Sequence, residues 1–582
     1  MPTAQDIENF KRAFRAKADE KFWGPRWEKA SYFFQKQTSL KEIVQALDTL
    51  KDTTNQENLT AVRTAMSRLS KGKKSRYKAA LELLESNLKT VMVEEETVGD
   101  ISLGKLEDGT LVIRGPNGDI ASGIEQEKME YVQNVLTELG TAGVDIDGVD
   151  DLIKSIVDDP KMGADSGDIQ GTIWEQAITH LKGPVLTGIK SDLGSMKTSG
   201  LIPDTAELKG VQFTGSDFHK GGKQVLILRF VDETGKEKKV VYKPSSLMVD
   251  SLLYGKDGIG GKLGGISTYN IVPVKTDDDP PKDKGYGYME FIDTGDGAST
   301  PEDVKGIFVE VAANMAMSYY VGLDDVHQEN ILIKTSGVQI IDMEATTGVF
   351  SSEGATPTTG GFYDQLWNKA LWEGVRPELT KLIEKKQLLE LPDEQAVANA
   401  MEERFKQVIT NMSKEGNKRD LKKLQTELAK QTTRTVPIAT NCFQKELIPK
   451  AKDYASLDLW QTMLDDDLNG SKALLTEARG ATTTPVATIK NLLYTKGVYD
   501  ALRRGDVPYY TRDLGSDKVK DERGEEIDVP GYKKVGLPID QAMEARRTAD
   551  PADVTKIFKE QALKQLRDIF ENLQFPLAVA RG

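Results

Sequence analysis

The sequence predicts an α+β protein that is predominantly helical, because two different hydrophobic periods alternate along it. Before about residue 95, and again from about residue 362 onward, apolar side chains recur at helical spacing with charges between them. At 99–123 and 211–243, short apolar runs are broken by Asp-Gly, Asn-Gly and other glycine-bearing turns, which is typical of hairpins. We therefore expect helical regions on both sides of a strand-rich centre.

The elements between these regions follow from the same two periods. The expected helices are E-Q-E-K-M-E-Y-V-Q-N-V-L-T-E-L-G, the segment around W-E-Q-A-I-T-H-L-K-G, S-S-L-M-V-D-S-L-L-Y-G, and the long E-D-V-K-G-I-F-V-E-V-A-A-N-M-A-M-S-Y-Y-V-G-L. The expected strands are V-Q-F, Q-V-L-I-L-R-F-V, K-K-V-V-Y-K-P, Y-G-Y-M-E-F-I and the pair in I-L-I-K-T-S-G-V-Q-I-I-D. A glycine- and proline-rich loop is expected at 255–285.

Composition excludes several classes of protein. The net charge of -14 disfavours a nucleic-acid-binding surface, which needs a basic domain. The single cysteine, Cys442, excludes an internal disulfide framework and a cysteine-rich zinc site, and it is expected to be a small buried side chain. No signal-type apolar core and no membrane-length apolar stretch occur, so we expect a cytoplasmic protein.

One of only three histidines lies in D-D-V-H-Q-E-N-I-L-I-K at 324–334. Asp325 precedes Asn330 by five positions, and Asp342 follows Asn330 by twelve. The catalytic loop of protein kinases has the same step from Asp to Asn, and a metal-binding Asp follows after a short hairpin. Phosphoryl transfer needs a carboxylate at the acceptor hydroxyl and oxygen ligands for magnesium. Asp325 is expected to fill the first role, and Asn330 and Asp342 the second, with Glu344 assisting the metal.

Upstream segments supply the other parts of such a site. Lys243 in K-K-V-V-Y-K-P is placed like the strand lysine that holds nucleotide phosphates in kinases. The loop G-S-D-F-H-K-G-G-K precedes it, and Gly221 and Gly222 would let backbone N–H groups approach the phosphates. Glu290, in M-E-F-I, lies where a hinge strand would meet adenine. This order predicts a lipid/protein-kinase-like two-lobed core with added helical regions.

The domain boundaries follow from that order. Residues 1–200 are expected to form a mostly helical N-terminal region, residues 201–300 the N-lobe, and residues 301–582 the C-lobe with helical C-terminal extensions. The chain has no G-x-G-x-x-G, H-R-D or D-F-G motif, and its metal segment reads D-M-E. It is therefore not an ordinary protein kinase.

Taken together, the motifs resemble the dehydratase domain of class II lanthipeptide synthetases (LanM type). The stretches that carry the resemblance are S-D-F-H-K-G-G, V-V-Y-K-P-S-S, Y-G-Y-M-E-F-I, D-V-H-Q-E-N-I-L-I and I-I-D-M-E-A. Two weaker matches follow in the family's order, R-T-V-P-I-A-T, which contains Arg434 and Thr440, and G-D-V-P-Y-Y-T, which contains Asp506 and Pro508. The resemblance covers roughly residues 200–515.

The resemblance implies a function and a set of roles. Such enzymes use ATP and Mg²⁺ to phosphorylate Ser and Thr of a precursor peptide that carries a leader segment, and then eliminate the phosphate to leave dehydroalanine or dehydrobutyrine. Phosphorylation and metal binding would fall to Asp325, His327, Asn330, Asp342 and Glu344. Lys243 would hold nucleotide phosphates and help to remove the α-proton. The phosphorylated side chain and its leaving phosphate would be positioned by Asp217, His219, Arg434 and Thr440.

The sequence also departs from the family pattern. Ser245 stands where members usually have Arg after Y-K-P, and Ile438 stands where members often have Arg two positions before the Thr. Two cations on the phosphate side are thus missing, which bears on elimination more than on phosphorylation. The family's C-terminal cyclase, whose zinc ligands are Cys and His, is also expected to be absent, so ring formation would need a separate cyclase.

Two other functions stay open at this stage. One is a kinase-only enzyme of the same fold that acts on a protein, and the other is a catalytically silent peptide-binding relative. Individual residues have plainer roles too: Asp217 and His219 are suited to capping a glycine turn, and Lys243 to an exposed strand end. Arg434 and Thr440 suit a solvated position beside a charged helix, and His180 is given no function. The charged run 402–430 is expected to be a solvated helix face, with an acidic leader peptide as its alternative partner.

Overall fold

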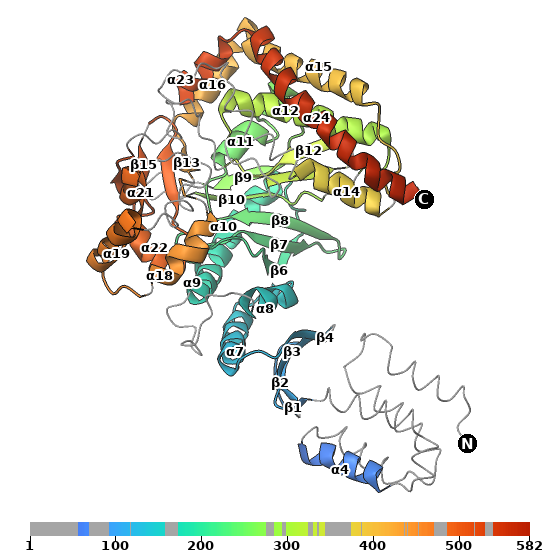
Figure 1. Cartoon of the computed structure of the whole chain (residues 1–582), viewed down its shortest axis with the longest axis vertical. Coiled ribbons are helices and arrows are strands. Elements are labelled where there is room, and N and C mark those ends of the chain that lie inside the picture. The colour runs from blue at the N-terminus through green and yellow to red at the C-terminus, as the bar shows by residue number, and fades with distance from the viewer. Residues whose placement is uncertain are drawn as a thin grey trace. The chain divides into compact units, whose positions relative to one another are not determined.

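In the computed structural model, the chain divides into two compact units, Met1–Ile178 and Thr179–Gly582, and the boundary lies within α9 (Ile173–His180) (Figure 1). The residues that the structure describes are 56–68, 92–106, 108–116, 118–157, 173–274, 285–293, 298–323, 330–334, 337–343, 374–385, 387–435, 437–438, 440–451, 453–470, 486–516, 518–529 and 539–581. No helix within these ranges has the length and apolar character that crossing a membrane requires.

The first unit contains an antiparallel four-stranded meander, in the order β1-β2-β3-β4. Its described elements are α4 (Gln56–Ser67), β1 (Met92–Val98), β2 (Ile101–Leu106), β3 (Leu111–Gly115), β4 (Gly118–Ser122), α7 (Gln126–Gly140), β5 (Asp145–Ile146) and α8 (Val149–Val157). The predicted hairpins at 99–123 are confirmed. The helical prediction up to about residue 95 is wrong at its end, because Met92 pairs with Leu106 and so begins a strand.

An antiparallel sheet organises the first half of the second unit, with its strands in the order β6-β7-β8-β10-β9. Here the elements are α10 (Leu186–Thr198), β6 (Glu207–Phe213), β7 (Leu226–Val231), β8 (Glu237–Lys243), α11 (Met248–Tyr254), β9 (Ile271–Val274) and β10 (Tyr286–Glu290). Alternate residues of β7 are buried, as a half-covered sheet requires. The predicted strands and the helix α11 are confirmed. The expected loop at 255–285 instead contains β9 and a π-helical turn, Gly260–Gly264.

The long helix α12 (Pro301–Val321) is the centre of the largest hydrophobic core. Thr300 caps its first turn in a capping box with Asp303, and Gly322 ends it in the left-handed conformation. Helix α12 packs against α15, and α15 packs against α24 (Figure 1). The neighbouring elements are β11 (Ile331–Lys334), β12 (Gly337–Ile340), α14 (Arg376–Glu384), α15 (Glu394–Ser413), α16 (Lys418–Leu428), α23 (Ile539–Arg547) and α24 (Pro551–Arg581).

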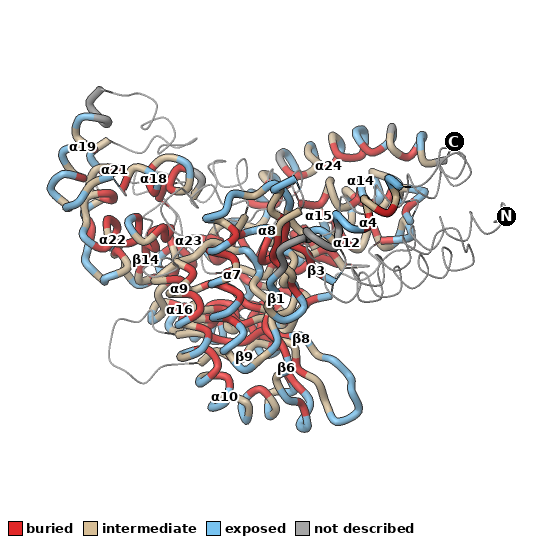
Figure 2. Tube along the Cα trace, turned by 90° about the horizontal axis from the view of Figure 1, so that it is seen from below, coloured by how far each residue is buried: buried red, intermediate tan, exposed pale blue. Residues whose placement is uncertain are grey.

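A separate small core surrounds a four-stranded antiparallel sheet, β13-β14-β15-β16. Its elements are β13 (Thr432–Thr435), α17 (Thr440–Cys442), α18 (Ile448–Ala451), α19 (Leu457–Gly470), α21 (Val486–Leu493), α22 (Lys496–Arg504), β14 (Tyr510–Asp513), β15 (Val519–Lys520) and β16 (Glu526–Ile527). Buried Trp460 donates its indole N–H to the Leu493 carbonyl, and Cys442 is buried as predicted. Figure 2 shows the buried residues along the inner sides of these helices. This sheet was not predicted from the sequence.

Candidate functional site

Lys243 is the last residue of β8, and its side chain is directed into the protein. Only 6% of its surface is exposed. Its Nζ lies 3.2 Å from Oδ1 of Asp342 and donates a hydrogen bond to the Ile341 carbonyl at 3.0 Å. A buried ammonium needs such partners, because desolvation disfavours an unpaired charge. Two of the residues that the sequence assigned to one site therefore meet, and Lys243 is not an exposed strand-end lysine.

The hairpin β11–β12 places Asp342. The Ile341 N–H donates to the Asn330 carbonyl at 3.1 Å, so Asn330 and Asp342 lie at the same end of the hairpin. The other side of this segment is fixed by α11, because the Met343 N–H donates to buried Asp250 at 3.4 Å. Of the predicted site residues, Asp325, His327 and Glu344 lie outside the described part of the chain.

The Asp342 side chain keeps 26% of its surface exposed. A carboxylate that is paired with a buried ammonium and still accessible is a suitable oxygen donor for magnesium beside phosphate groups. Asn330 lies at the same hairpin end and has the amide oxygen expected of a second donor. Within the described ranges, no group of three or more His, Cys, Asp and Glu side chains forms a complete metal site by itself.

The glycine-bearing loop 215–223 has an unusual backbone. Its second half is closed by two reciprocal backbone hydrogen bonds between His219 and Lys223, at 3.0 and 2.8 Å. Between them Lys220, Gly221 and Gly222 take φ angles of 50°, 78° and 81°. Three successive left-handed residues fold the chain back tightly, which glycine permits at little cost.

Residues 505–509 hold this loop from the other side. The Val507 N–H donates to the Phe218 carbonyl at 3.2 Å, and His219 Nδ1 lies 2.9 Å from the Val507 carbonyl, to which it donates. The Gly221 N–H donates to Asp506 Oδ2 at 2.7 Å. The sequence predicted that the Gly221 N–H would approach a phosphate. In the structure it donates its hydrogen bond to Asp506 instead.

The segment that contains Arg434 and Thr440 joins the same cluster. Arg434 lies on β13, opposite Thr511 of β14, which brings it next to the 505–510 segment. Its guanidinium carbon lies 5.4 Å from the centre of the Tyr509 ring. Asp217 accepts a hydrogen bond from the Gln444 side chain, four residues after Thr440. The structure thus brings loop 215–223, Arg434 and residues 506–511 into one cluster, and Thr440 begins helix α17, four residues before Gln444.

Asp506 is completely buried within this cluster. Burial raises the pKa of Asp506 to about 7, and the negative charge of Glu522 adds to this rise. The Gly221 N–H and the Arg504 guanidinium, 3.6 Å away, oppose it by favouring the carboxylate. The charge of Asp506 therefore varies near neutral pH, at a residue that fixes the shape of the loop.

Glu290 is engaged by the chain itself. Its N–H donates to the Asn270 carbonyl at 2.8 Å, and its carboxylate accepts from the Asn270 N–H at 3.3 Å and pairs with Lys238 at 3.4 Å. The backbone donor proposed for adenine is thus already used at this residue. His180 is also a structural residue: burial lowers its pKa to about 4, and its Nε2 lies 3.4 Å from the Tyr242 hydroxyl.

Sequence reasoning missed four residues of these clusters: Lys220, Tyr509, Gln444 and Asp250. Lys220 and Tyr509 lie inside two of the matched motifs, S-D-F-H-K-G-G and G-D-V-P-Y-Y-T, so the motifs themselves could have pointed to them. Gln444 and Asp250 contact the clusters only through the tertiary fold, and no local pattern marks them.

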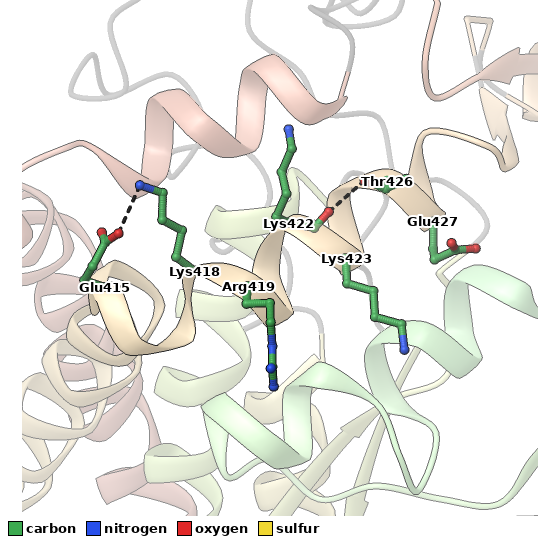
Figure 3. A pocket seen from close by; sticks show the side chains of 7 residues that line it. All are labelled: Glu415, Lys418, Arg419, Lys422, Lys423, Thr426 and Glu427. Carbon is green, nitrogen blue, oxygen red and sulfur yellow. Dashed lines mark hydrogen bonds and ion pairs between the residues drawn. The ribbon is translucent and has the colours of Figure 1, made fainter.

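The charged run 402–430 forms the end of α15 and helix α16. The exposed side of α16 borders an open groove of about 630 Å³, lined by Glu415, Lys418, Arg419, Lys422, Lys423, Thr426 and Glu427 (Figure 3). Lys418 pairs with Glu415 at 3.0 Å, and Glu427 pairs with Lys430 at 2.8 Å. The predicted solvated helix face is therefore confirmed on α16, and its groove is mainly basic.

Two comparisons with known proteins agree with the resemblance in its coarse form. A family model described as "Domain of unknown function (DUF4135)" matches residues 171–370, which include loop 215–223, Lys243 and Asp342. The chain is also 23% identical over 225 residues to the lacticin 481/lactococcin biosynthesis protein LcnDR2 of Lactococcus lactis subsp. lactis. That alignment covers 38% of this chain and 22% of the relative. The similarity supports a distant relation to LanM-type proteins.

Proposed function

We propose that this chain is a lanthipeptide dehydratase. It uses ATP and Mg²⁺ to phosphorylate Ser and Thr of a ribosomal precursor peptide, and then eliminates the phosphate to leave dehydroalanine or dehydrobutyrine. The observation that carries the proposal is the contact between Lys243 Nζ and Asp342 Oδ1 at 3.2 Å, in a chain distantly similar to a lacticin biosynthesis protein. A lipid/protein-kinase-like core, with the sheet β6–β10 in its smaller lobe, is part of the proposal.

Phosphorylation is assigned to the end of β8 and the hairpin β11–β12. Lys243 would bind nucleotide phosphates, and Asp342 and Asn330 would provide oxygen donors beside them. Bound magnesium would supply positive charge against the phosphate oxygens. Asp325, His327 and Glu344 complete the proposed set, with Asp325 at the acceptor hydroxyl.

Elimination is assigned to the cluster around loop 215–223. A base removes the proton from Cα of the phosphorylated residue, the new electron pair forms the Cα–Cβ double bond, and the Cβ–O bond breaks to release phosphate. Lys243 helps to remove the proton, and Arg434 binds the leaving phosphate through its planar fork. Asp217 and His219 position the side chain, supported by the hydrogen bonds to Gln444 and Val507.

The leader segment of the precursor is assigned to the groove on α16. Residues 414–430 contain six cations and three acids, in a chain whose net charge is -14. Lys422 and Lys423 line the groove. A local basic surface on an acidic protein favours a short acidic peptide over a long polyanion, which the rest of the chain would repel.

Replacement of Arg434 separates the two halves of this reaction. We expect Arg434→Ala to phosphorylate the peptide normally and to accumulate phosphopeptide, because the leaving phosphate loses its guanidinium partner. Elimination should slow roughly 100-fold or more. Mass spectrometry of a precursor peptide encoded beside this gene, incubated with ATP and magnesium, measures both products in one reaction.

The matched variant Arg434→Lys keeps the charge and loses the planar fork, so it should eliminate phosphate at an intermediate rate. If Arg434→Ala dehydrates the peptide as fast as the wild type, the role given to this segment is wrong. A wild-type protein that only phosphorylates would support the kinase-only alternative, which the missing cations at Ser245 and Ile438 favour.

A further inference from the structure

Lys220 holds a backbone conformation that lysine rarely adopts. Among the described residues it is the one non-glycine residue with a positive φ, at 50°. Side chains with a Cβ pay a free-energy cost there, and such positions persist only where the surrounding structure enforces them. The enforcing contacts are those between loop 215–223 and residues 505–509, including Gly221 to Asp506 at 2.7 Å.

This conformation directs the Lys220 side chain to Tyr509. Lys220 Nζ lies 3.8 Å from the centre of the Tyr509 ring, and the Arg434 guanidinium carbon lies 5.4 Å from the same centre. The His219 ring meets Tyr509 edge-on, at 5.6 Å between ring centres. Tyr509 itself is 5% exposed, so its buried ring is a fixed support for two basic side chains and a histidine ring.

Lys220 and Arg434 therefore bring two basic side chains to one ring, and each can donate hydrogen bonds to the oxygens of an anion. A phosphate ester, with about two negative charges near neutral pH, matches two such groups better than a single carboxylate does. Lys220 is half-buried, so one side of it is within reach of solvent and of a ligand.

We propose that Lys220 and Arg434, supported by Tyr509, form the binding site for the leaving phosphate. The inference rests on the proposed dehydratase function and adds to it a cation from a different segment. Ser245 and Ile438 replace two cations that LanM-type sequences usually carry, and Lys220 restores positive charge on the phosphate side. In the elimination step, Lys220 and Arg434 stabilise the negative charge that the phosphate oxygen gains as the Cβ–O bond breaks.

Three variants distinguish the effect of the Lys220 charge from the effect of its left-handed backbone conformation. Lys220→Gly removes the cation and relieves the left-handed strain, Lys220→Arg keeps a cation at the same φ, and Lys236→Ala removes an exposed lysine in the turn between β7 and β8. Each is given a synthetic phosphoserine peptide, so that elimination is measured without prior phosphorylation. Inorganic phosphate and ATP are titrated separately, and thermal unfolding reports binding.

We expect Lys220→Gly to eliminate phosphate roughly 10- to 100-fold more slowly and to lose stabilisation by inorganic phosphate. Lys220→Arg and Lys236→Ala should retain both properties, and ATP should stabilise all variants equally. Elimination and phosphate binding that survive in Lys220→Gly would overturn the inference, and so would a loss of ATP binding, which would move Lys220 to the nucleotide. A wild type that binds phosphate through Lys220 but never eliminates it would instead contradict the dehydratase function.

Discussion

At the scale of single residues, buried charges with specific partners define both clusters. Lys243 is held by Asp342 and the Ile341 carbonyl, and Asp506 by the Gly221 N–H. The first pair was predicted, because the spacing of the matched motifs assigned both residues to one phosphate site. The second contact was not predicted, because Gly221 and Asp506 are 285 residues apart and neither sequence segment indicates the other.

Removing the Asp342 carboxylate should affect activity far more than stability. We expect Asp342→Asn to lower phosphorylation roughly 100-fold or more, because the neutral amide lacks the negative charge with which a carboxylate binds magnesium. The free energy of unfolding should fall by about 1–2 kcal/mol, since Lys243 keeps the Ile341 carbonyl but loses a charged partner. Phosphopeptide formation and urea unfolding measure the two effects. Full activity in this variant would remove Asp342 from the phosphate site.

Asp506 should make stability depend on pH. Its pKa is about 7 when folded and near 3.8 when exposed in the unfolded chain, so the folded state binds its proton more tightly. Its favourable contribution is therefore complete below about pH 4 and is lost as the pH rises through about 7. Relative to Asp506→Asn, the wild type should lose roughly 2–4 kcal/mol across this window.

The measurement is the free energy of unfolding of both proteins at several pH values. Asparagine keeps an oxygen acceptor for the Gly221 N–H, so the comparison changes ionisation more than geometry. Parallel curves for the two proteins would show that Asp506 does not titrate in this window.

At the scale of elements, the long and periodic segments were predictable and the short strands were not. Helix α12 combines a capping box, an apolar interior and a glycine end, so its sequence specifies it locally. Strands β13 and β14 have four residues each and become a sheet only by pairing across a long insertion. The sequence T-T-R-T carries no alternation of apolar and polar residues, so this sheet, and with it the place of Arg434, depended on the tertiary fold.

Helix α16 provides a separate test of peptide binding. We expect the double substitution Lys422→Glu and Lys423→Glu to raise the KM for a precursor with an acidic leader roughly 10-fold, with little change in kcat. The matched control is Lys556→Glu with Lys564→Glu on α24, which changes the net charge equally at exposed positions. The difference between the two should shrink as salt is added.

If both double variants raise KM equally, the change in KM comes from net charge, and the groove on α16 does not bind the peptide. A KM that is unchanged in both would leave the leader segment without a partner on α16. A peptide without the leader segment completes the comparison. Its KM should be the same for the wild type and for the variant with Lys422→Glu and Lys423→Glu.

At the scale of the whole molecule, the second unit contains every described residue of both clusters, since it spans Thr179–Gly582. One cluster is formed by β8 and the hairpin β11–β12, and the other by loop 215–223, β13 and the segment before β14. The family match at 171–370 covers the first cluster and the loop of the second. The sequence motifs could therefore place Lys243 and Asp342 together, and the resemblance grouped Asp217, His219 and Arg434 in a second proposed site. The contacts of that second cluster with Asp506 and Tyr509 required the three-dimensional structure.

The most direct test of the central claim is to incubate the purified chain with ATP, magnesium and the precursor peptide, and to measure peptide mass, ADP and free phosphate together. We predict that each modified residue lowers the peptide mass by one water, and that ADP and phosphate appear in equal amounts. A peptide that gains phosphate without losing water, or that keeps its mass while ATP is untouched, would contradict the assignment of phosphorylation and elimination to this chain.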